Sequence, residues 1–327
     1  MLCLSFKVQK VGAYGTIYIR ANGSIDPPTE AITTIDGITY TFTDNIIFGS
    51  IVVERNDIVI DGAGYTLQGT RAYLSKGIRI DLTGRTNVTV RNIQIKNFDY
   101  GIWLFFSSGN SISGNNITNN NYGIWISYSS SNSITGNNIA ANNRYGINLD
   151  GSSDNIICHN NFDNAQQVIV TSSGNPNVWD DGYPVGGNFW SDYNGTDLFS
   201  GHDQNETGRD AIGDTEYFID GNNTDNHPLM GMFSDLNAAP DQPVTTICNS
   251  TISDFQFNGT AITFDVTGVE GTTGFCRTCI PTSLMNATYR VFVNGTEVSC
   301  NLLPCSNSTH SYLYFTYTHS TQHVIIT

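Results

Sequence analysis

The stretch from residue 77 to residue 167 consists of four consecutive copies of one unit, GIRIDLTGRTNVTVRNIQIKNFDY (77–100), GIWLFFSSGNSISGNNITNNNY (101–122), GIWISYSSSNSITGNNIAANNRY (123–145) and GINLDGSSDNIICHNNFDNAQQ (146–167). The copies open at Gly77, Gly101, Gly123 and Gly146, so the period is 24, 22 and 23 residues. Self-similarity at a fixed period of this length is the signature of a solenoid.

Apolar residues alternate at the start of each copy, which is the periodicity of a β-strand. The inward positions are Ile78/Ile80, Ile102/Leu104, Ile124/Ile126 and Ile147/Leu149. A second apolar position follows at Val88, Ile112, Ile134 and Ile156, and a third at Ile93, Ile117, Ile139 and Phe162. Three short strands per copy, separated by Ser, Gly and Asn bends, predict a parallel β-helix of about six coils stacked at about 4.8 Å.

Asparagines recur one residue before the third apolar position, at Asn92, Asn116, Asn138 and Asn161. They are expected at the corners of the coils, either as a hydrogen-bonded column or as residues that tolerate left-handed backbone angles. Two substitutions follow from this register. Ile124→Asp is expected to abolish folding because it buries an unpaired charge, whereas Ser129→Asp is expected to be tolerated at a bend.

The composition argues for an exported protein that does not bind nucleic acid. The net charge of the 327-residue chain is −15, and only 13% of residues are charged, which excludes a basic nucleic-acid surface. Eleven Asn-x-Ser/Thr sequons occur, and a secreted chain is expected to carry glycans on them. The sites predicted to be modified are Asn22, Asn87, Asn194, Asn222, Asn249, Asn258, Asn286, Asn294 and Asn307.

No segment is long enough to span a membrane, and the opening Met1–Phe6 is too short for a complete signal peptide. A membrane contact would therefore need an anchor that this chain lacks. Seven cysteines are present. In an extended Cys276-x-x-Cys279 segment the thiols would face opposite sides about 10 Å apart, too far for one disulfide. Cys300 and Cys305 flank a predicted turn, and we expect them to pair in a secreted chain.

The chain divides into three parts. Residues 1–45 are expected to cap the open end of the solenoid, and residues 46–236 to form the β-helix with an aromatic C-terminal capping segment. Residues 238–243 (AAPDQP) look like a linker. Residues 244–327 contain short alternating runs and the hairpin turn Asn294-Gly295, which predict a small Ig-like β-sandwich.

The repeats GI-x-L…SS-x-NSI-x-GNNI, followed by GGNFWSDY, IGDTEYFIDG and HPLM, resemble the NosD-like family of right-handed β-helix proteins. The opening GTIYIRANGSIDPP and the tail TTGFCRTCIP…YFTYTHSTQH are similar to secreted, cell-surface members of this group in archaea. The resemblance implies a right-handed all-β solenoid and an extracellular location. The family name carries an association with periplasmic copper delivery, whereas in the surface proteins the implied role is structural or adhesive.

An aromatic surface is the first candidate site. Side chains one residue after the inward isoleucines point outward, which places Arg79, Trp103, Trp125 and Asn148 in one column with Phe105 beside it. The outward column next to it is Asp81, Phe105, Ser127 and Asp150. Trp103 and Trp125 are expected to stack in adjacent coils. Exposed aromatic side chains of this kind suit sugar rings or a protein partner, or they only stiffen the solenoid.

Metal sites and catalysis are the remaining candidates. The oxygen-bearing residues Asp203, Asn205 and Thr207, with Asp210 and Asp214, have the alternating spacing of a calcium loop. His227, Met230 and Met232 could ligate Cu(I). Asp180-Asp181 is the only adjacent acidic pair and the one candidate for polysaccharide hydrolysis or lyase chemistry. We assign no catalytic residue and no certain cofactor, and expect a non-catalytic surface, adhesin or fibre protein.

Its expected partners are other surface proteins, glycans or further copies of itself. The terminal apolar strand Val324–Ile326 and the aromatic column are the two surfaces predicted to join such copies.

Overall fold

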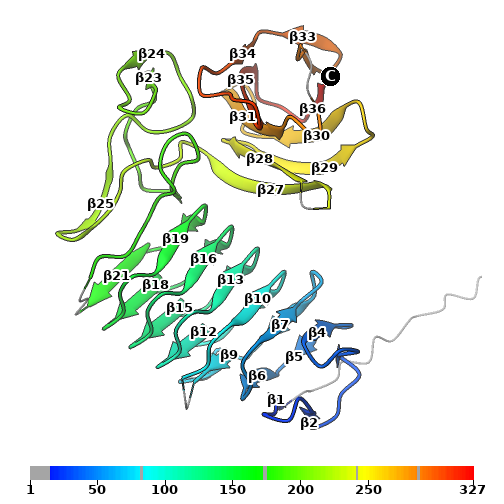
Figure 1. The fold of residues 1–327 in the computed structure, drawn as a ribbon, viewed down its shortest axis with the longest axis vertical. Helices are drawn as coiled ribbons and strands as arrows, with labels where there is room; N and C mark the ends of the chain where they lie inside the picture. Colours follow the sequence, from blue (N-terminus) through cyan, green and yellow to red (C-terminus); the bar gives the residue numbers. More distant parts are fainter. Residues whose placement is uncertain (1–14, 82–83, 172–174, 241, 286–287) are drawn as a thin grey trace, which may run out of the picture. The chain divides into compact units, whose positions relative to one another are not determined.

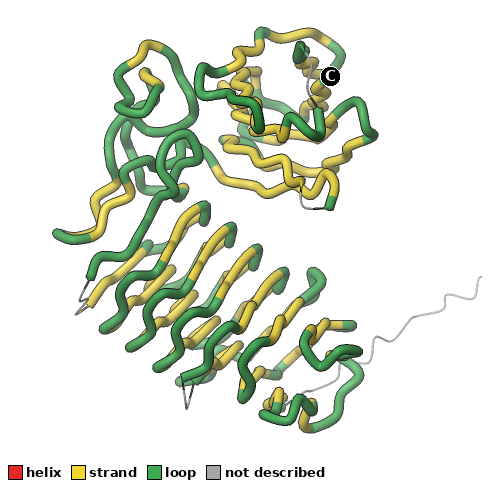
Figure 2. The backbone as a smooth tube through the Cα atoms, viewed as in Figure 1, coloured by secondary structure: helices red, strands yellow, loops and turns green. Residues whose placement is uncertain are grey.

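The computed structural model describes residues 15–81, 84–171, 175–240, 242–285 and 288–327. Every regular element in these ranges is a β-strand, and the strands alternate with short loops (Figure 2). No helix capable of crossing a bilayer occurs in the part of the chain that the structure describes. The chain forms two compact units. The first holds the residues up to Asn132 with 139–152 and 164–173, and the second holds 133–138, 153–163 and 174–327.

A β-solenoid of about six turns confirms the predicted fold class. Its longest sheet lies within the first unit, where strands from successive turns lie side by side (Figure 1). The order of this sheet is β2 (Ile25–Asp26), β1 (Thr16–Ile19), β6 (Ser50–Val53), β9 (Lys76–Ile80), β12 (Tyr100–Phe105), β15 (Tyr122–Ser127), β18 (Tyr145–Asp150) and β21 (Val168–Thr171). Apart from β2, its strands pair in parallel.

Two seven-stranded sheets form the other sides of the solenoid. One has the order β19 (Ile156–Cys158), β16 (Ser133–Thr135), β13 (Ser111–Ser113), β10 (Val88–Arg91), β7 (Ile58–Asp61), β4 (Thr39–Phe42) and β3 (Ile32–Thr33). The other has the order β22 (Phe189–Trp190), β20 (Asn161–Asp163), β17 (Asn138–Ala140), β14 (Asn116–Thr118), β11 (Gln94–Lys96), β8 (Thr66–Gln68) and β5 (Ile46–Ile47).

The first inward column has the predicted register. Ile78, Ile102, Ile124 and Ile147 lie opposite one another in successive strands, and each is 0% exposed. β-Branched side chains fit this pleated, stacked surface, so one residue type recurs at the same place in each turn.

The second and third columns differ from the prediction at their ends. Ile112 pairs with Val90 rather than Val88, and Ile134 pairs with Ile157, which leaves Ile156 48% exposed. In the third column Ile117 pairs with Ile95, not Ile93. The first copy is two residues longer than the second, and the extra residues precede β10, so counting from Gly77 gives a register two residues too early.

Buried polar ladders occupy the corners, but the predicted asparagines are not their members. Asn92 and Asn116 are exposed, and Asn138 and Asn161 are half-buried. Each ladder instead runs through side chains, all buried except the half-buried Asn164, whose oxygen accepts the backbone N–H of the preceding turn. Within the first unit these bonds join Ser107, Ser129 and Ser152; Asn110 and Asn132; and Asn120, Asn142 and Asn164.

In the second unit two ladders of the same kind end in the capping segment. One joins Asn155, Asn177 and Asn223, and the other joins Asn137, Asn160, Asn188 and Asp225. The physical reason for the missed assignment is a shift of one residue. In the pairs 115–116, 137–138 and 160–161 the first asparagine is buried at the corner and the second begins the next strand. Asn92 has φ 57°, so the left-handed interpretation holds for that residue.

Two antiparallel five-stranded sheets form the C-terminal part of the second unit. One has the order β27 (Met232–Ala239), β28 (Gln242–Cys248), β31 (Thr273–Pro281), β35 (His310–Thr318) and β34 (Cys300–Leu302). The other has the order β29 (Thr251–Phe257), β30 (Ile262–Thr267), β36 (Gln322–Ile326), β32 (Val291–Val293) and β33 (Thr296–Val298). Both contribute to one core that includes Phe264, Leu313 and Val324. The arrangement is that of a sandwich.

Three short segments of this region were predicted from the sequence: a hairpin turn, a linker and a terminal strand. Asn294 and Gly295 have φ 49° and 78° and join β32 to β33, as predicted for the hairpin. The predicted linker does not separate the strands on its two sides, because β27 and β28 form a hairpin in which Ala239 pairs with Gln242. The strand Val324–Ile326 lies inside its sheet and pairs on both sides, with β30 and β32, so it has no free edge to donate.

The small capping strands are β23 (Phe199–Ser200) with β24 (Glu206–Thr207), and β25 (Tyr217–Asp220) with β26 (Asn223–Asp225).

All six described cysteines are free thiols in the structure, so the predicted Cys300–Cys305 disulfide is not formed there, and Cys248 and Cys276 are also reduced. Cys300 packs against the core between the two sheets, whereas Cys305 packs against a separate apolar cluster with Ile212 and Tyr312. The predicted glycosylation sites are all exposed where the structure describes them, and Asn286 lies outside the described residues.

Candidate functional site

Tyrosines form a row along the outward face of the longest sheet. Tyr100, Tyr122 and Tyr145 lie in register in β12, β15 and β18. Their rings stack at centroid distances of 5.2 and 5.9 Å with interplanar angles of 13° and 26°. The ring faces are therefore turned toward one another, and the ring edges and hydroxyl groups point to the surroundings.

Trp103 and Trp125 lie next to this row and directly opposite each other in the register. The rings are linked through Tyr100, which stacks on Trp103 at 5.9 Å and meets Trp125 edge-on at 5.1 Å. Phe105 contacts Trp103 at 5.7 Å. The predicted direct stacking of the two indoles is not among the ring contacts of the described residues, and both indoles contact Tyr100 instead.

Cations border the same face. The Lys76 ammonium lies 3.7 Å from the centre of the Trp103 ring, a cation–π distance. Burial, together with the nearby Arg79, lowers the pKa of Lys76. Arg144 donates a 2.9 Å hydrogen bond to the Tyr122 hydroxyl. A cleft of 350 Å³ begins at Lys76 and Arg79 and continues along Tyr18 and Ser50.

We call this surface the aromatic face; it comprises Lys76, Arg79, Tyr100, Trp103, Phe105, Tyr122, Trp125, Arg144 and Tyr145. Asn148, predicted to belong to it, is only 8% exposed, because it lies between Trp125 and Ile169 of the adjoining strands. Of the second predicted outward column, Asp81 and Ser127 are also buried, at 2% and 4% exposure.

The sequence interpretation missed the tyrosine row, although its signal is plain in the repeats. A tyrosine closes the first three copies, directly before the Gly-Ile that opens the next one. At the far edge of the sheet Phe106 and Tyr128 stack at 5.1 Å and are 55% and 54% exposed, so the aromatic surface extends over the corner.

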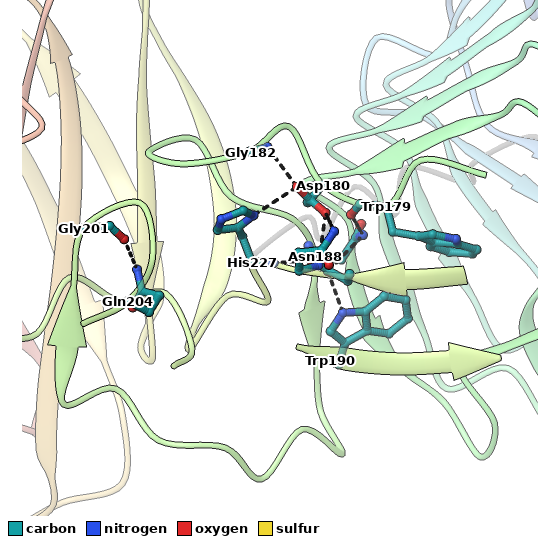
Figure 3. Close-up of polar contacts among 10 residues, drawn as sticks. Trp179, Asp180, Gly182, Asn188, Trp190, Gly201, Gln204 and His227 are labelled. Atoms are coloured by element: carbon teal, nitrogen blue, oxygen red, sulfur yellow. Dashed lines mark hydrogen bonds and ion pairs between the residues drawn. The ribbon is translucent and has the colours of Figure 1, made fainter. Parts of the chain in front are cut away.

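A second polar constellation lies in the capping segment of the second unit. Figure 3 shows the contacts of Asp180 with Gly182 and with His227 as dashed lines. One Asp180 oxygen accepts the Gly182 N–H and lies 3.0 Å from His227 Nδ1, and the other accepts the backbone and side-chain N–H groups of Asn226, each at 3.0 Å. Burial by itself raises the pKa of Asp180, but these hydrogen bonds outweigh it and lower the pKa to about 2.

The pKa of His227, which contacts Asp180, is shifted in the opposite direction. The hydrogen bond with Asp180 raises the pKa of His227 against the effect of burial, helped by the charge of Asp225 and by the backbone of His202. Asp225, 0% exposed, accepts the Trp190 indole N–H at 2.9 Å. Burial raises its pKa to about 7. Asp180 therefore clamps loops of the cap, and Asp181 takes no part in these bonds.

The residues proposed to bind calcium lie in unlike environments. Asp203, Asn205 and Thr207 are exposed, and Asp203 lies 2.9 Å from His202. Asp210 is 0% exposed, and Asp214 accepts backbone N–H groups of Leu198 and Phe199. Calcium binding at these residues stays a prediction.

A comparison with known protein families identifies the family of the chain. Residues 8–195, more than half of the chain, match the family model of the periplasmic copper-binding protein NosD. The chain belongs to the NosD family. No curated protein matches it.

Solved structures similar to this NosD family member include two tailspike proteins. The Dettilon tailspike protein is 12% identical with a TM-score of 0.29, covering 89% of this chain and 67% of that one. The enzymatically active domain of Bacteriophage CBA120 tailspike protein 2 is 12% identical with a TM-score of 0.31, covering 95% and 60%.

The family description raises the question of copper, and the possible donors among the described residues do not gather into a centre. Among the described residues no three His, Cys, Asp or Glu side chains gather closely enough to hold a metal ion. His227 Nδ1 faces Asp180, as described above, and Met230 and Met232 are half-buried.

Proposed function

We propose that this protein is a non-catalytic extracellular scaffold that assembles with further copies of itself through the aromatic face. The observation that carries the proposal is the three-turn row of Tyr100, Tyr122 and Tyr145 with its flanking tryptophans. Tyrosine, tryptophan and arginine are the residues enriched at protein–protein hot spots.

The ring geometry favours a protein partner over a sugar. A sugar ring stacks on an open aromatic face, but the tyrosine faces cover one another and Lys76 covers Trp103. The aromatic face exposes ring edges, hydroxyl groups and cations, and these groups suit contacts with the side chains and carboxylates of a protein.

Charge favours a second copy of the chain as that partner. Lys76, Arg79 and Arg144 border the face of a molecule with a net charge of −15. Exposed acidic residues such as Asp203, Glu206 and Glu216 lie in the second unit. A contact between two different surfaces of identical chains is a head-to-tail contact. Such contacts form a ring if the rotation between successive copies closes, and otherwise they propagate into a filament.

Sedimentation velocity over a range of protein and salt concentrations tests this assembly. Wild-type protein is expected to form oligomers that weaken as salt rises, and the double variant Trp103→Ala/Trp125→Ala to stay monomeric. Phe218→Ala, which removes an exposed ring outside the face, is the matched control. Protein that stays monomeric at every concentration contradicts self-assembly, and turnover of uronans that depends on Asp180 or Asp181 contradicts the non-catalytic role.

A further inference from the structure

Two cysteines face each other across neighbouring strands of the sandwich. Cys248 ends β28, Cys276 lies in β31, and the antiparallel register places them directly opposite each other. They are 1% and 0% exposed and lie in the core between the sheets. Directly opposed residues of antiparallel strands have Cα atoms about 4.5–5.5 Å apart, which is within the span of a disulfide.

A chain of buried polar groups fixes the Cys248 sulfur. The thiol donates to the Phe275 carbonyl at 3.1 Å and lies 3.3 Å from the Tyr317 hydroxyl. That hydroxyl is 2.7 Å from Ser250 Oγ, which is 2.7 Å from His319 Nε2. A thiol held by such contacts has little freedom to turn away from its neighbour.

The surroundings make the two sulfurs unequal. Burial acts to raise the pKa of both thiols. For Cys248 the hydrogen bonds from the Cys276 thiol, Tyr317 and Ser250 outweigh burial and lower the pKa, whereas the pKa of Cys276 is raised. The thiolate is the nucleophile in disulfide exchange, so Cys248 is the sulfur that reacts first.

We propose that Cys248 and Cys276 become joined by a cross-strand disulfide, formed by exchange with a low-molecular-weight disulfide while β28 pairs with β31. The Cys248 thiolate attacks one sulfur of the small disulfide, whose S–S bond breaks and releases one thiol. The Cys276 thiolate then attacks the Cys248 sulfur and releases the second. Two protein thiols are oxidised, and one small disulfide is reduced to two thiols.

The bond joins neighbouring strands of one sheet and closes a loop of chain that passes through the other sheet. The chain between its ends contains β29 and β30, which belong to the opposite sheet. Closing this loop restricts the unfolded chain, and the burial of both sulfurs protects the finished bond from reductants. This pairing replaces the Cys300–Cys305 bond expected from the spacing alone.

Peptide mapping tests the pairing directly. The full chain is unfolded with reductant, refolded in a glutathione redox buffer, alkylated, and digested with trypsin and Glu-C. These enzymes release Cys248 in fragment 217–270, Cys276 in 271–277, Cys279 in 278–290, and Cys300 with Cys305 in 298–327. The expected product is 271–277 linked to 217–270. Alkylated thiols in both fragments, or a link from 271–277 to any other fragment, overturns the proposal.

Stability measurements give an independent check. Refolding in dithiothreitol instead of the glutathione buffer is expected to lower the melting temperature of wild type by about 10 °C or more, and to have no such effect on Cys248→Ser or Cys276→Ser. The double variant Cys300→Ser/Cys305→Ser is the matched control and is expected to respond as wild type does. If the serine variants do not fold, the peptide map of the wild-type protein still shows whether Cys248 and Cys276 are linked. A wild-type melting temperature that dithiothreitol leaves unchanged contradicts the proposal.

Discussion

The side-chain amide of Asn161 hydrogen-bonds both backbone polar groups of Phe233. The Phe233 N–H donates to Asn161 Oδ1 at 2.7 Å, and Asn161 Nδ2 donates to the Phe233 carbonyl at 2.9 Å. Phe233 lies in β27, the edge strand of its sheet. One asparagine of the last turns of the solenoid therefore satisfies an edge residue of the sandwich as a neighbouring strand would. His159 stacks on the Phe233 ring at 4.6 Å and supports the contact.

Asn161→Ala is expected to lower the free energy of unfolding by about 1–3 kcal/mol, because both Phe233 groups lose their partner. Asp163→Ala, an exposed change on the same strand β20, serves as the control and is expected to be neutral. Urea denaturation of the three proteins measures the difference. Equal midpoints for Asn161→Ala and wild type would show that water replaces the amide without loss.

Gly101→Ala tests how closely the turns approach. A Cβ at Gly101 would lie 2.6 Å from the Gly123 carbonyl oxygen and 3.0 Å from the Asn120 amide nitrogen. Because the obstructing oxygen is backbone, relief requires neighbouring turns to separate, at a cost of about 1–3 kcal/mol. Gly221→Ala, where a Cβ meets nothing within 4 Å, is the matched substitution and should leave the thermal melt unchanged.

Ser129→Asp is expected to be severely destabilising, contrary to the tolerance suggested by its place at a bend. Ser129 is 0% exposed, its oxygen accepts the Ser107 N–H, and its hydroxyl donates to the Ser127 carbonyl. A buried carboxylate there would cost about 3 kcal/mol or more. Ser131→Asp changes an exposed neighbour. Circular dichroism melts of both variants, with Ser131→Asp close to wild type, are the measurement; a folded and stable Ser129→Asp protein would refute the ladder.

Stability should depend on pH through the cap. The raised pKa of His227 gives stability that is present below about pH 6.5, the pKa of an unfolded histidine, and is lost as pH rises through the folded value. The pKa values of Asp225 and Asp197, about 7, act in the same direction, because the folded state holds protons that the unfolded state has released. The lowered pKa of Asp180 adds stability above about pH 4 that is lost toward pH 2.

The urea midpoint is therefore expected to fall between pH 5 and pH 8. His227→Gln should reduce that fall, whereas His202→Gln, at a side chain that is 81% exposed, should not. A midpoint that does not change over this interval, or an equal effect of the two variants, would argue against the clamp.

Sequence alone predicts what repeats strictly. Ile78, Ile102, Ile124 and Ile147 form the expected column because a period-two pattern fixes the face of every strand. The prediction of inward and outward side chains was wrong where a shift of one residue changes the direction of the side chain. In the Asn-Asn pairs the two amides differ by a single position at the corner, and hydrophobicity does not distinguish them.

Contacts between segments that are far apart in the chain were also not predicted from the sequence. Nothing in the spacing of Asp180 and His227 indicates that they meet, since they are 47 residues apart and lie outside the repeats. The tyrosine row, by contrast, was available in the sequence but was not recognised as a column. Cys248 and Cys276 are opposed only because β29 and β30 leave for the other sheet between them.

The corner ladders also mean that each turn of the solenoid is completed by the turn that follows it in sequence. In each ladder described above the backbone N–H of one turn is satisfied by a side chain of the turn that follows it in sequence, and two of the ladders end in the cap at Asn223 and Asp225. During translation each turn therefore waits for the next one to leave the ribosome before its corners are complete. In evolution, duplicating a whole unit ahead of the cap lengthens the solenoid without disturbing this arrangement, whereas loss of the cap leaves the last turn unfinished. Natural variants of the protein should thus differ in length by whole turns, with one ending retained.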